Sequence, residues 1–139
     1  MVDLINDIDW KSLIFGAAIS AAIIIFASHG YDWLYLFSSV GLLYVGYTAK
    51  TRLYGAILGA IAAIPMLLLA FQGAFGDLGS FYTTGLGMIV ITLIFLLIGA
   101  VVGLVGAWGK LSREKAKVEY EKKQKSEETK KTTKNLPKK

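Results

Sequence analysis

The chain has 139 residues, 55% of them hydrophobic, and its 15 Lys and Arg against 10 Asp and Glu give a formal net charge of +5. Across the 98 residues from 12 to 109, the only charged side chains are Asp32, Lys50, Arg52 and Asp77. A soluble domain carries about a quarter charged residues. The composition therefore excludes a water-soluble globular protein and predicts an all-α polytopic membrane protein.

Four apolar runs lie between polar breaks along the chain. We expect transmembrane helices at about residues 11–29, 33–50, 53–73 and 83–109, so that residues 1–109 form one four-helix transmembrane domain made of two hairpins. A helix needs about 20 residues to cross ~30 Å of hydrocarbon, so the first two runs are short and the fourth is long enough to tilt. Ten-residue alternation of apolar and polar side chains does not occur, which excludes a membrane barrel.

The positions of the cations predict the topology. All 15 Lys and Arg precede the first run, lie in the loop at Lys50 and Arg52, or follow the fourth run. The positive-inside rule then places both termini and this loop in the cytoplasm, at the cell membrane. Three tryptophans fall at predicted water–lipid boundaries and are expected to be interfacial anchors. They are Trp10, Trp33 and Trp108.

Residues 110–139 form a basic tail with 12 Lys and Arg against 5 Glu. We expect the fourth helix to continue to about Glu121 and the remainder, Thr129–Lys139 above all, to be disordered. Such a charge predicts binding to anionic lipid headgroups of the inner leaflet. Nucleic acid is not expected as a partner, because no aromatic stacking platform accompanies the basic residues.

Small residues recur at spacings that put them on one face of a helix. In lipid, helices associate through close backbone approach at such residues, so these stripes predict helix–helix contacts within the chain, with a second copy, or with other membrane proteins. The expected contact residues are Gly16, Ser20, Gly55, Gly59, Gly99, Gly103 and Gly106. Pro65 lies inside the third run and predicts a helix kink, because proline removes one backbone hydrogen bond.

The two predicted hairpins resemble each other. Residues 15–21 match residues 54–60 as aromatic-Gly-Ala-x-x-small-Ala, and residues 45–50 match residues 105–110 as Val-Gly-x-x-small-Lys. Matching helices run in the same direction, so a duplication would be a parallel repeat about an axis along the membrane normal. The other interpretation is that small and aromatic residues recur by composition alone.

Residues that carry chemistry are scarce. Acidic, basic and His residues occur only at the ends of the predicted spans, as Lys11, His29 and Lys50, and none lies in a span interior. This weighs against a pump, a proton-coupled transporter or a membrane-embedded hydrolase. His29 lies alone in an outer turn, and a metal site would need further ligands. We therefore expect no catalytic, cofactor-binding or metal-binding residues. The loop at residues 73–85 is interpreted either as flexible or as an amphipathic turn lying in the outer interface on Phe75, Leu78 and Tyr82.

Three short motifs suggest a relationship. They are Asp9-Trp10-Lys11 with Gly16 at the first helix, Val45-Gly46-Tyr47 at the end of the second, and the segment 54–60 at the start of the third. Over residues 9–109 the chain resembles a family of small four-helix membrane proteins of methanogenic and halophilic archaea, a domain of unknown function. The resemblance implies an archaeal cell membrane and supplies no activity and no functional residues.

The leading hypothesis is a non-enzymatic integral membrane protein that serves as a structural or accessory helix-packing component. The alternative is an oligomeric channel or facilitator for a small neutral or weakly charged solute. Missing intramembrane charge and the small-residue stripes favour the first hypothesis. A continuous stripe of Ser and Thr facing one lumen would favour the second.

Overall fold

The structure of the chain is a computed structural model that describes residues 8–76 and 83–137. Within these residues the chain is helical and no strand occurs, as an all-α protein requires. The helices are α2 (Trp10–Ala27), the 3-10 helix η1 (Asp32–Phe37), α3 (Ser39–Thr48), α4 (Arg52–Ala62), α5 (Ile64–Phe71) and α6 (Gly85–Lys134).

In the part of the chain that the structure describes, three segments are long and apolar enough to cross a membrane: α2, the pair α4–α5, and the apolar part of α6. The second predicted span, residues 33–50, differs from a regular helix because it divides into η1 and the ten-residue α3. At the division, the hydroxyls of Ser38 and Ser39 donate to the carbonyls of Tyr35 and Leu36, three residues back. Such local hydrogen bonds compete with the α-helical pattern, which favours the tighter 3-10 turn here.

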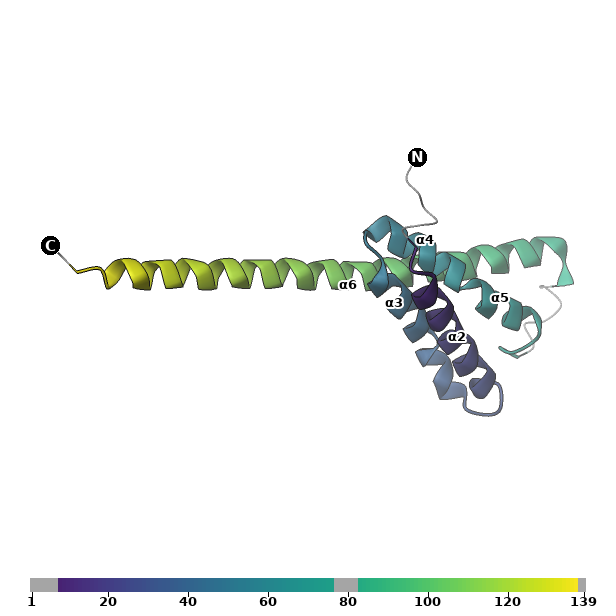
Figure 1. The fold of residues 1–139 in the computed structure, drawn as a ribbon. Coiled ribbons are helices and arrows are strands. Elements are labelled where there is room, and N and C mark those ends of the chain that lie inside the picture. Colours follow the sequence, from purple (N-terminus) through teal and green to yellow (C-terminus); the bar gives the residue numbers. More distant parts are fainter. Residues whose placement is uncertain (1–7, 77–82, 138–139) are drawn as a thin grey trace.

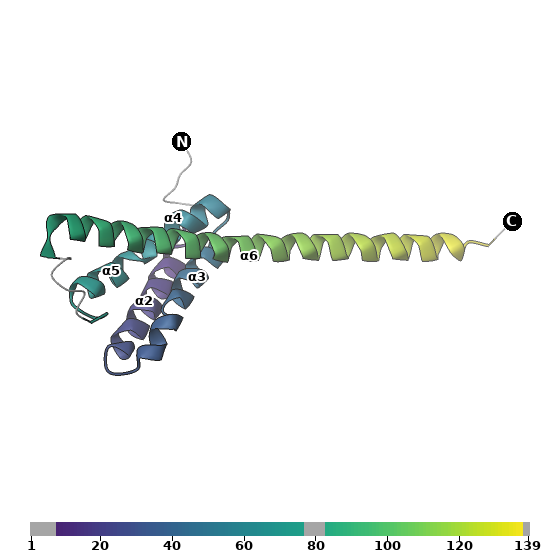
Figure 2. The ribbon, with the colours of Figure 1, turned by 180° about the vertical axis from the view of Figure 1, so that it is seen from behind.

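The helices form an open cluster crossed by one very long helix. In Figures 1 and 2, α2 and η1–α3 make a hairpin that α6 crosses obliquely, and α6 then extends alone to the C-terminus. Both α3 and α4 pack extensively along α6, while α2 packs mainly on α3. The centre of the fold is therefore the region of α6 that α3 and α4 both reach.

The third predicted span is broken. Its two halves are α4 and α5, which meet at Ala63, two residues before Pro65. The N–H of Ala63 still donates to the carbonyls of Gly59 and Ala60, at 3.1 and 3.2 Å. Proline cannot continue this pattern, since it has no N–H and its ring crowds the preceding turn. Beyond the break, α5 diverges from α6 (Figure 1) and also contacts α2.

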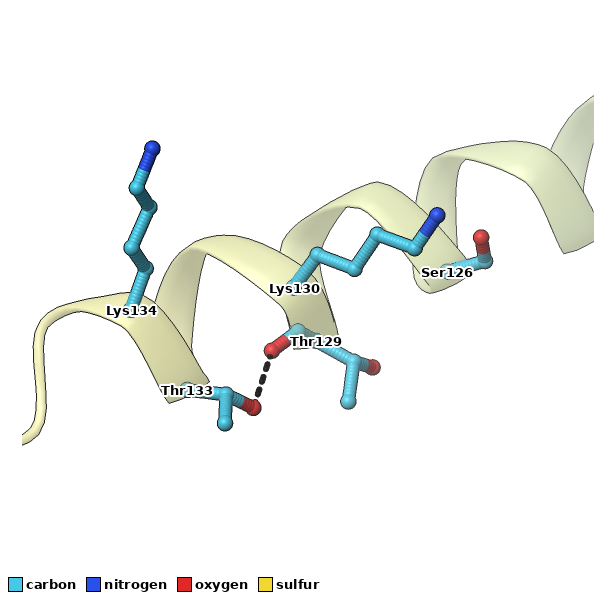
Figure 3. A pocket seen from close by; sticks show the side chains of 5 residues that line it. All are labelled: Ser126, Thr129, Lys130, Thr133 and Lys134. Carbon is cyan, nitrogen blue, oxygen red and sulfur yellow. Dashed lines mark hydrogen bonds between the residues drawn. The ribbon is translucent and has the colours of Figure 1, made fainter.

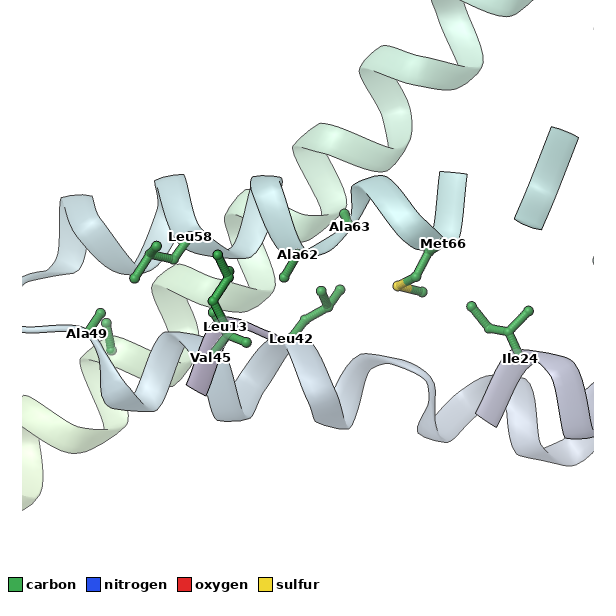
Figure 4. Packing of buried hydrophobic residues seen from close by; sticks show 10 residues of the cluster. Leu13, Ile24, Leu42, Val45, Ala49, Leu58, Ala62, Ala63 and Met66 are labelled. Carbon is green, nitrogen blue, oxygen red and sulfur yellow. The ribbon is translucent and has the colours of Figure 1, made fainter. Parts of the chain in front are cut away.

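The buried core is small and rich in alanine. Its cluster contains Leu13, Ile24, Leu42, Val45, Ala49, Leu58, Ala62, Ala63, Met66 and Ala107, most of which are labelled in Figure 4. Many larger apolar side chains point outward, including Leu36, which is 81% exposed, and Leu97, which is 65% exposed. In water this surface would be unfavourable, whereas hydrocarbon solvates it.

The tail corrects an expectation. We expected the helix to end at about Glu121 and disorder from Thr129, but α6 continues to Lys134. No Gly or Pro interrupts residues 110–134, and Glu residues precede Lys residues by four positions, as in Glu121–Lys125 and Glu127–Lys131. Each such pair stabilises an exposed helix by ~0.2–0.5 kcal/mol. Pro137, just beyond the end, prevents further continuation.

Candidate functional site

The closest helix contacts are made of glycine backbones around Gly103 of α6. A Cβ atom placed on Gly59 of α4 would lie 2.8 Å from the Cα of Gly103, and one on Gly55 would lie 2.7 Å from the Gly103 carbonyl oxygen. On the other side, a Cβ on Gly46 of α3 would lie 2.7 Å from the Cα of Gly103. Real Cβ atoms essentially never come closer than 3.0 Å to another heavy atom. We call these residues, with Gly99, the glycine junction.

Gly99 and a further predicted residue, Gly106, extend the contacts along α6. A Cβ on Gly99 would lie 2.7 Å from the Cβ of Ala63, beside the break before Pro65. A Cβ on Gly106 would lie 2.9 Å from the backbone nitrogen of Tyr47 in α3. Glycines of α6 therefore face α4 and α3 on two different sides, so three helices meet through their backbones.

The first hairpin closes in the same way. A Cβ on Gly16 would lie 2.6 Å from the Gly41 carbonyl oxygen, and one on Gly41 would lie 3.0 Å from the backbone nitrogen of Ser20. Gly41 and Gly46 were not in the expected contact set. They lie five residues apart in α3, outside a four-residue stripe, so the positions of the facing helices reveal their part in packing.

The same contact recurs in both hairpins. Gly41 lies between Gly16 and Ser20, and Gly103 lies between Gly55 and Gly59. The matching motifs at residues 45–50 and 105–110 would instead equate Gly41 with Val101, two positions before Gly103. The contact is therefore repeated with a shift of two residues between the hairpins.

Hydroxyl groups in the helices bond to their own backbone. Ser28, Thr48 and Thr92 donate to the carbonyls of Ile25, Val45 and Met88, at 2.7, 2.8 and 2.8 Å. Ser20 differs from these three residues, since its Oγ is fully buried beside Gly41 and has no hydrogen-bond partner. Buried against a glycine backbone, this hydroxyl acts as a small packing group.

An aromatic cluster closes the end of the fold near residue 75. The ring of Phe75 stacks on Tyr35 of η1 at 5.1 Å between centroids and meets Phe95 of α6 edge-on at 5.6 Å. The hydroxyl of Tyr35 also donates to the carbonyl of Ala74. Phe75 thus packs, half-buried, between two helices, whereas an amphipathic turn would direct its ring away from them. Leu78 and Tyr82 lie outside the described residues.

The predicted anchors have exposed rings. Trp10, Trp33 and Trp108 are 49%, 61% and 54% exposed, so each indole is available to an interface. His29 is exposed, and its Nδ1 lies 2.7 Å from the Ile25 carbonyl. Over residues 8–76 and 83–137, no three His, Cys, Asp or Glu side chains come together as a metal site would need.

Asp9 begins α2 as its N-cap. One carboxylate oxygen accepts from the Ser12 hydroxyl at 2.6 Å and the other from the Ser12 N–H at 3.3 Å. Both bonds favour the charged carboxylate, so they lower the pKa of Asp9 from its ordinary value of 3.8. A negative charge at this position also complements the helix dipole.

One hollow lies far from these contacts. It has a volume of about 640 Å³ and is lined by Ser126, Thr129, Lys130, Thr133 and Lys134, near the end of α6 (Figure 3). All five side chains come from one exposed helix, with no second element to form an opposite wall. A surface of this kind does not enclose a ligand.

No family model, no curated protein and no solved structure matches the chain. Function is therefore inferred from the contacts described above.

Proposed function

We propose that the chain is an integral membrane protein without catalytic activity, which serves as a structural or accessory component through helix packing. The observation that carries this proposal is the glycine junction, where α3 and α4 meet α6 through their backbones. Because lipid supplies little hydrophobic force between helices, contacts of this kind are what hold a membrane bundle together.

Four spans are proposed, although among the described residues three segments have the length and hydropathy of a regular transmembrane helix. A 3-10 helix rises about 2.0 Å per residue and an α-helix about 1.5 Å. The six residues of η1 and the ten of α3 thus extend about 27 Å together, the same as the 18 residues of α2. This length supports a second span beside α2, because the hydrocarbon layer is about 30 Å thick.

The orientation follows from charge. All cations flank the helix ends that carry the N-terminus, the loop at Lys50 and Arg52, and the tail, so both termini are placed in the cytoplasm. Residues 85–109 of α6 extend about 37 Å, and tilt accommodates the excess over the bilayer. An archaeal cell membrane is proposed on the family resemblance alone.

A packing role requires a partner surface, and α6 supplies one. In the most apolar stretch of 18 residues in this helix, only 11% of the residues are buried within the chain. Leu86, Ile89, Leu93 and Leu97 are all more than half exposed and recur every three or four residues. This face is available to lipid, to a second copy of the chain, or to a helix of another membrane protein.

Purification of the tagged protein from its own membrane in a mild detergent tests the proposal. We expect a second membrane protein, or a second copy of the chain, in fixed stoichiometry after crosslinking. In parallel, proteoliposomes should release small neutral solutes no faster than empty liposomes. Rapid release would overturn the proposal in favour of a channel or facilitator.

A further inference from the structure

A basic groove lies where α3 ends and α6 leaves the apolar region. It has a volume of about 380 Å³ and is lined by Tyr47 of α3 and by Lys110, Arg113, Glu114, Ala116 and Lys117 of α6. Two separate helices form its walls, in contrast to the hollow near Thr129. The Nζ of Lys110 lies 3.5 Å from the carbonyl oxygen of Ala49, just beyond the end of α3, which ties the two walls together.

The groove concentrates positive charge. Lys110, Arg113 and Lys117 lie three and four residues apart, so they share one face of α6. Glu114 is the one acidic side chain among the lining residues, which leaves the groove with a formal charge of +2. Arginine binds phosphate through a planar fork of two N–H groups, and the Tyr47 hydroxyl adds a neutral donor. Together, the three cations, the arginine fork and the Tyr47 hydroxyl suit a phosphate group, which offers several oxygen acceptors at once.

The depth of the groove points to a lipid. Trp108, two residues before Lys110, is 54% exposed, and Tyr47 is 41% exposed. Exposed aromatic rings of this kind lie at the headgroup level of a bilayer. The groove would therefore open sideways into the layer that contains lipid phosphates, on the cytoplasmic side where the cations lie.

We propose that this groove binds the phosphate of an anionic phospholipid of the inner leaflet. The site rests on the proposed membrane location, and it is narrower than an attraction of the whole tail to the bilayer. Lys110, Arg113 and Lys117 lie within about 11 Å of one another along α6, next to the headgroups, whereas Lys125 lies about 22 Å beyond Lys110 along the same helix. That distance exceeds a Debye length of ~8 Å, so the distal lysines contribute little to lipid binding.

Native mass spectrometry of the full chain in a neutral detergent tests the proposal. The protein is titrated with phosphatidylglycerol and, separately, with phosphatidylcholine of the same acyl chains. We expect preferential binding of phosphatidylglycerol. Lys117→Gln should weaken it about fivefold, and Tyr47→Phe about two- to tenfold. The matched controls Lys125→Gln and Tyr120→Phe, on the exposed tail, should leave binding unchanged.

Each contrary result overturns the site in a distinct way. Equal weakening by Lys117→Gln and Lys125→Gln would mean a diffuse attraction with no built groove. Equal binding of the two lipids would exclude recognition of the anionic headgroup. Displacement of the lipid by glycerol 3-phosphate at equal concentration would assign the groove to a soluble phosphate compound. Thiol labelling in intact cells tests the membrane location separately, so failure of the site and failure of the location are distinguishable.

Discussion

Gly59 and Gly103 lie backbone to backbone, since a methyl group on Gly59 would come within 2.8 Å of the Cα of Gly103. The pair joins α4 to α6 at the place where α3 also reaches α6. A side chain at either position would push α4 and α6 apart. The two helices come this close because both residues are glycine.

The first prediction is that the same substitution, glycine to alanine, changes stability in opposite directions at two positions of α6. Gly103→Ala should lower the thermal stability of the protein in detergent, by about 1–3 kcal/mol, because the new methyl group overpacks the junction. Gly109→Ala is the control, since nothing lies within 4 Å of its added Cβ. There alanine should stabilise the helix by about 0.5–1 kcal/mol. Equal stabilisation by both changes would show that α6 is not packed at Gly103.

The second prediction concerns the aromatic cluster. Phe75→Ala removes two ring contacts worth roughly 0.5–1.5 kcal/mol each, so we expect a loss of about 1–3 kcal/mol in stability. Phe26→Ala is the matched control, because Phe26 is 65% exposed. Thermal unfolding followed by circular dichroism compares the two. A Phe75 variant as stable as the Phe26 variant would mean that the segment before residue 77 does not pack inward.

The third prediction concerns the tail. Spin labels at cysteines replacing Ser112 and Thr132 should be separated by about 30 Å in a narrow distribution, because twenty helical residues rise about 1.5 Å each. A flexible chain of the same length would give a broad distribution near 25 Å. Double electron–electron resonance measures this directly in a protein that has no native cysteine. A broad distribution would restore the expectation of disorder.

Topology gives the fourth prediction. A single cysteine replacing His29 should react with a membrane-impermeant thiol reagent in intact cells. Cysteines replacing Thr51 or Lys125 should react only after the membrane is opened, since both positions lie with the cations. Reaction at residue 51 in intact cells would reverse the assigned orientation, and reaction at all three positions would exclude the proposed topology.

The fifth prediction concerns pH. The pKa of Asp9 is lower in the folded chain than its ordinary value of 3.8. Its capping contribution to stability is therefore present in full above the ordinary pKa and is lost as the pH falls through the folded pKa. Asp9→Asn keeps a capping side chain but cannot titrate in this range. The melting temperature of the native protein should fall more steeply below pH 4 than that of the variant, and parallel curves would contradict this role of Asp9.

The sequence by itself determined that the chain is helical and where it is apolar, and it marked the break before Pro65. These properties are local, because hydropathy and backbone chemistry act over a few neighbouring residues. The spacing of Glu121 and Lys125 was also visible in the sequence, yet composition suggested disorder. Helix propensity in an uninterrupted stretch prevails there.

Only the tertiary structure decided which residues face each other. In α2 nearly every side chain is apolar. The helix therefore has no distinct polar face from which its rotation relative to its neighbours could be predicted. Gly41 and Gly46 gained their packing roles from the positions of Gly16 and Gly103 on other helices, and Phe75 turned inward because Tyr35 and Phe95 are there to receive it. Contacts between helices depend on rotation, crossing angle and register, and the chain sets these only when all its helices pack together.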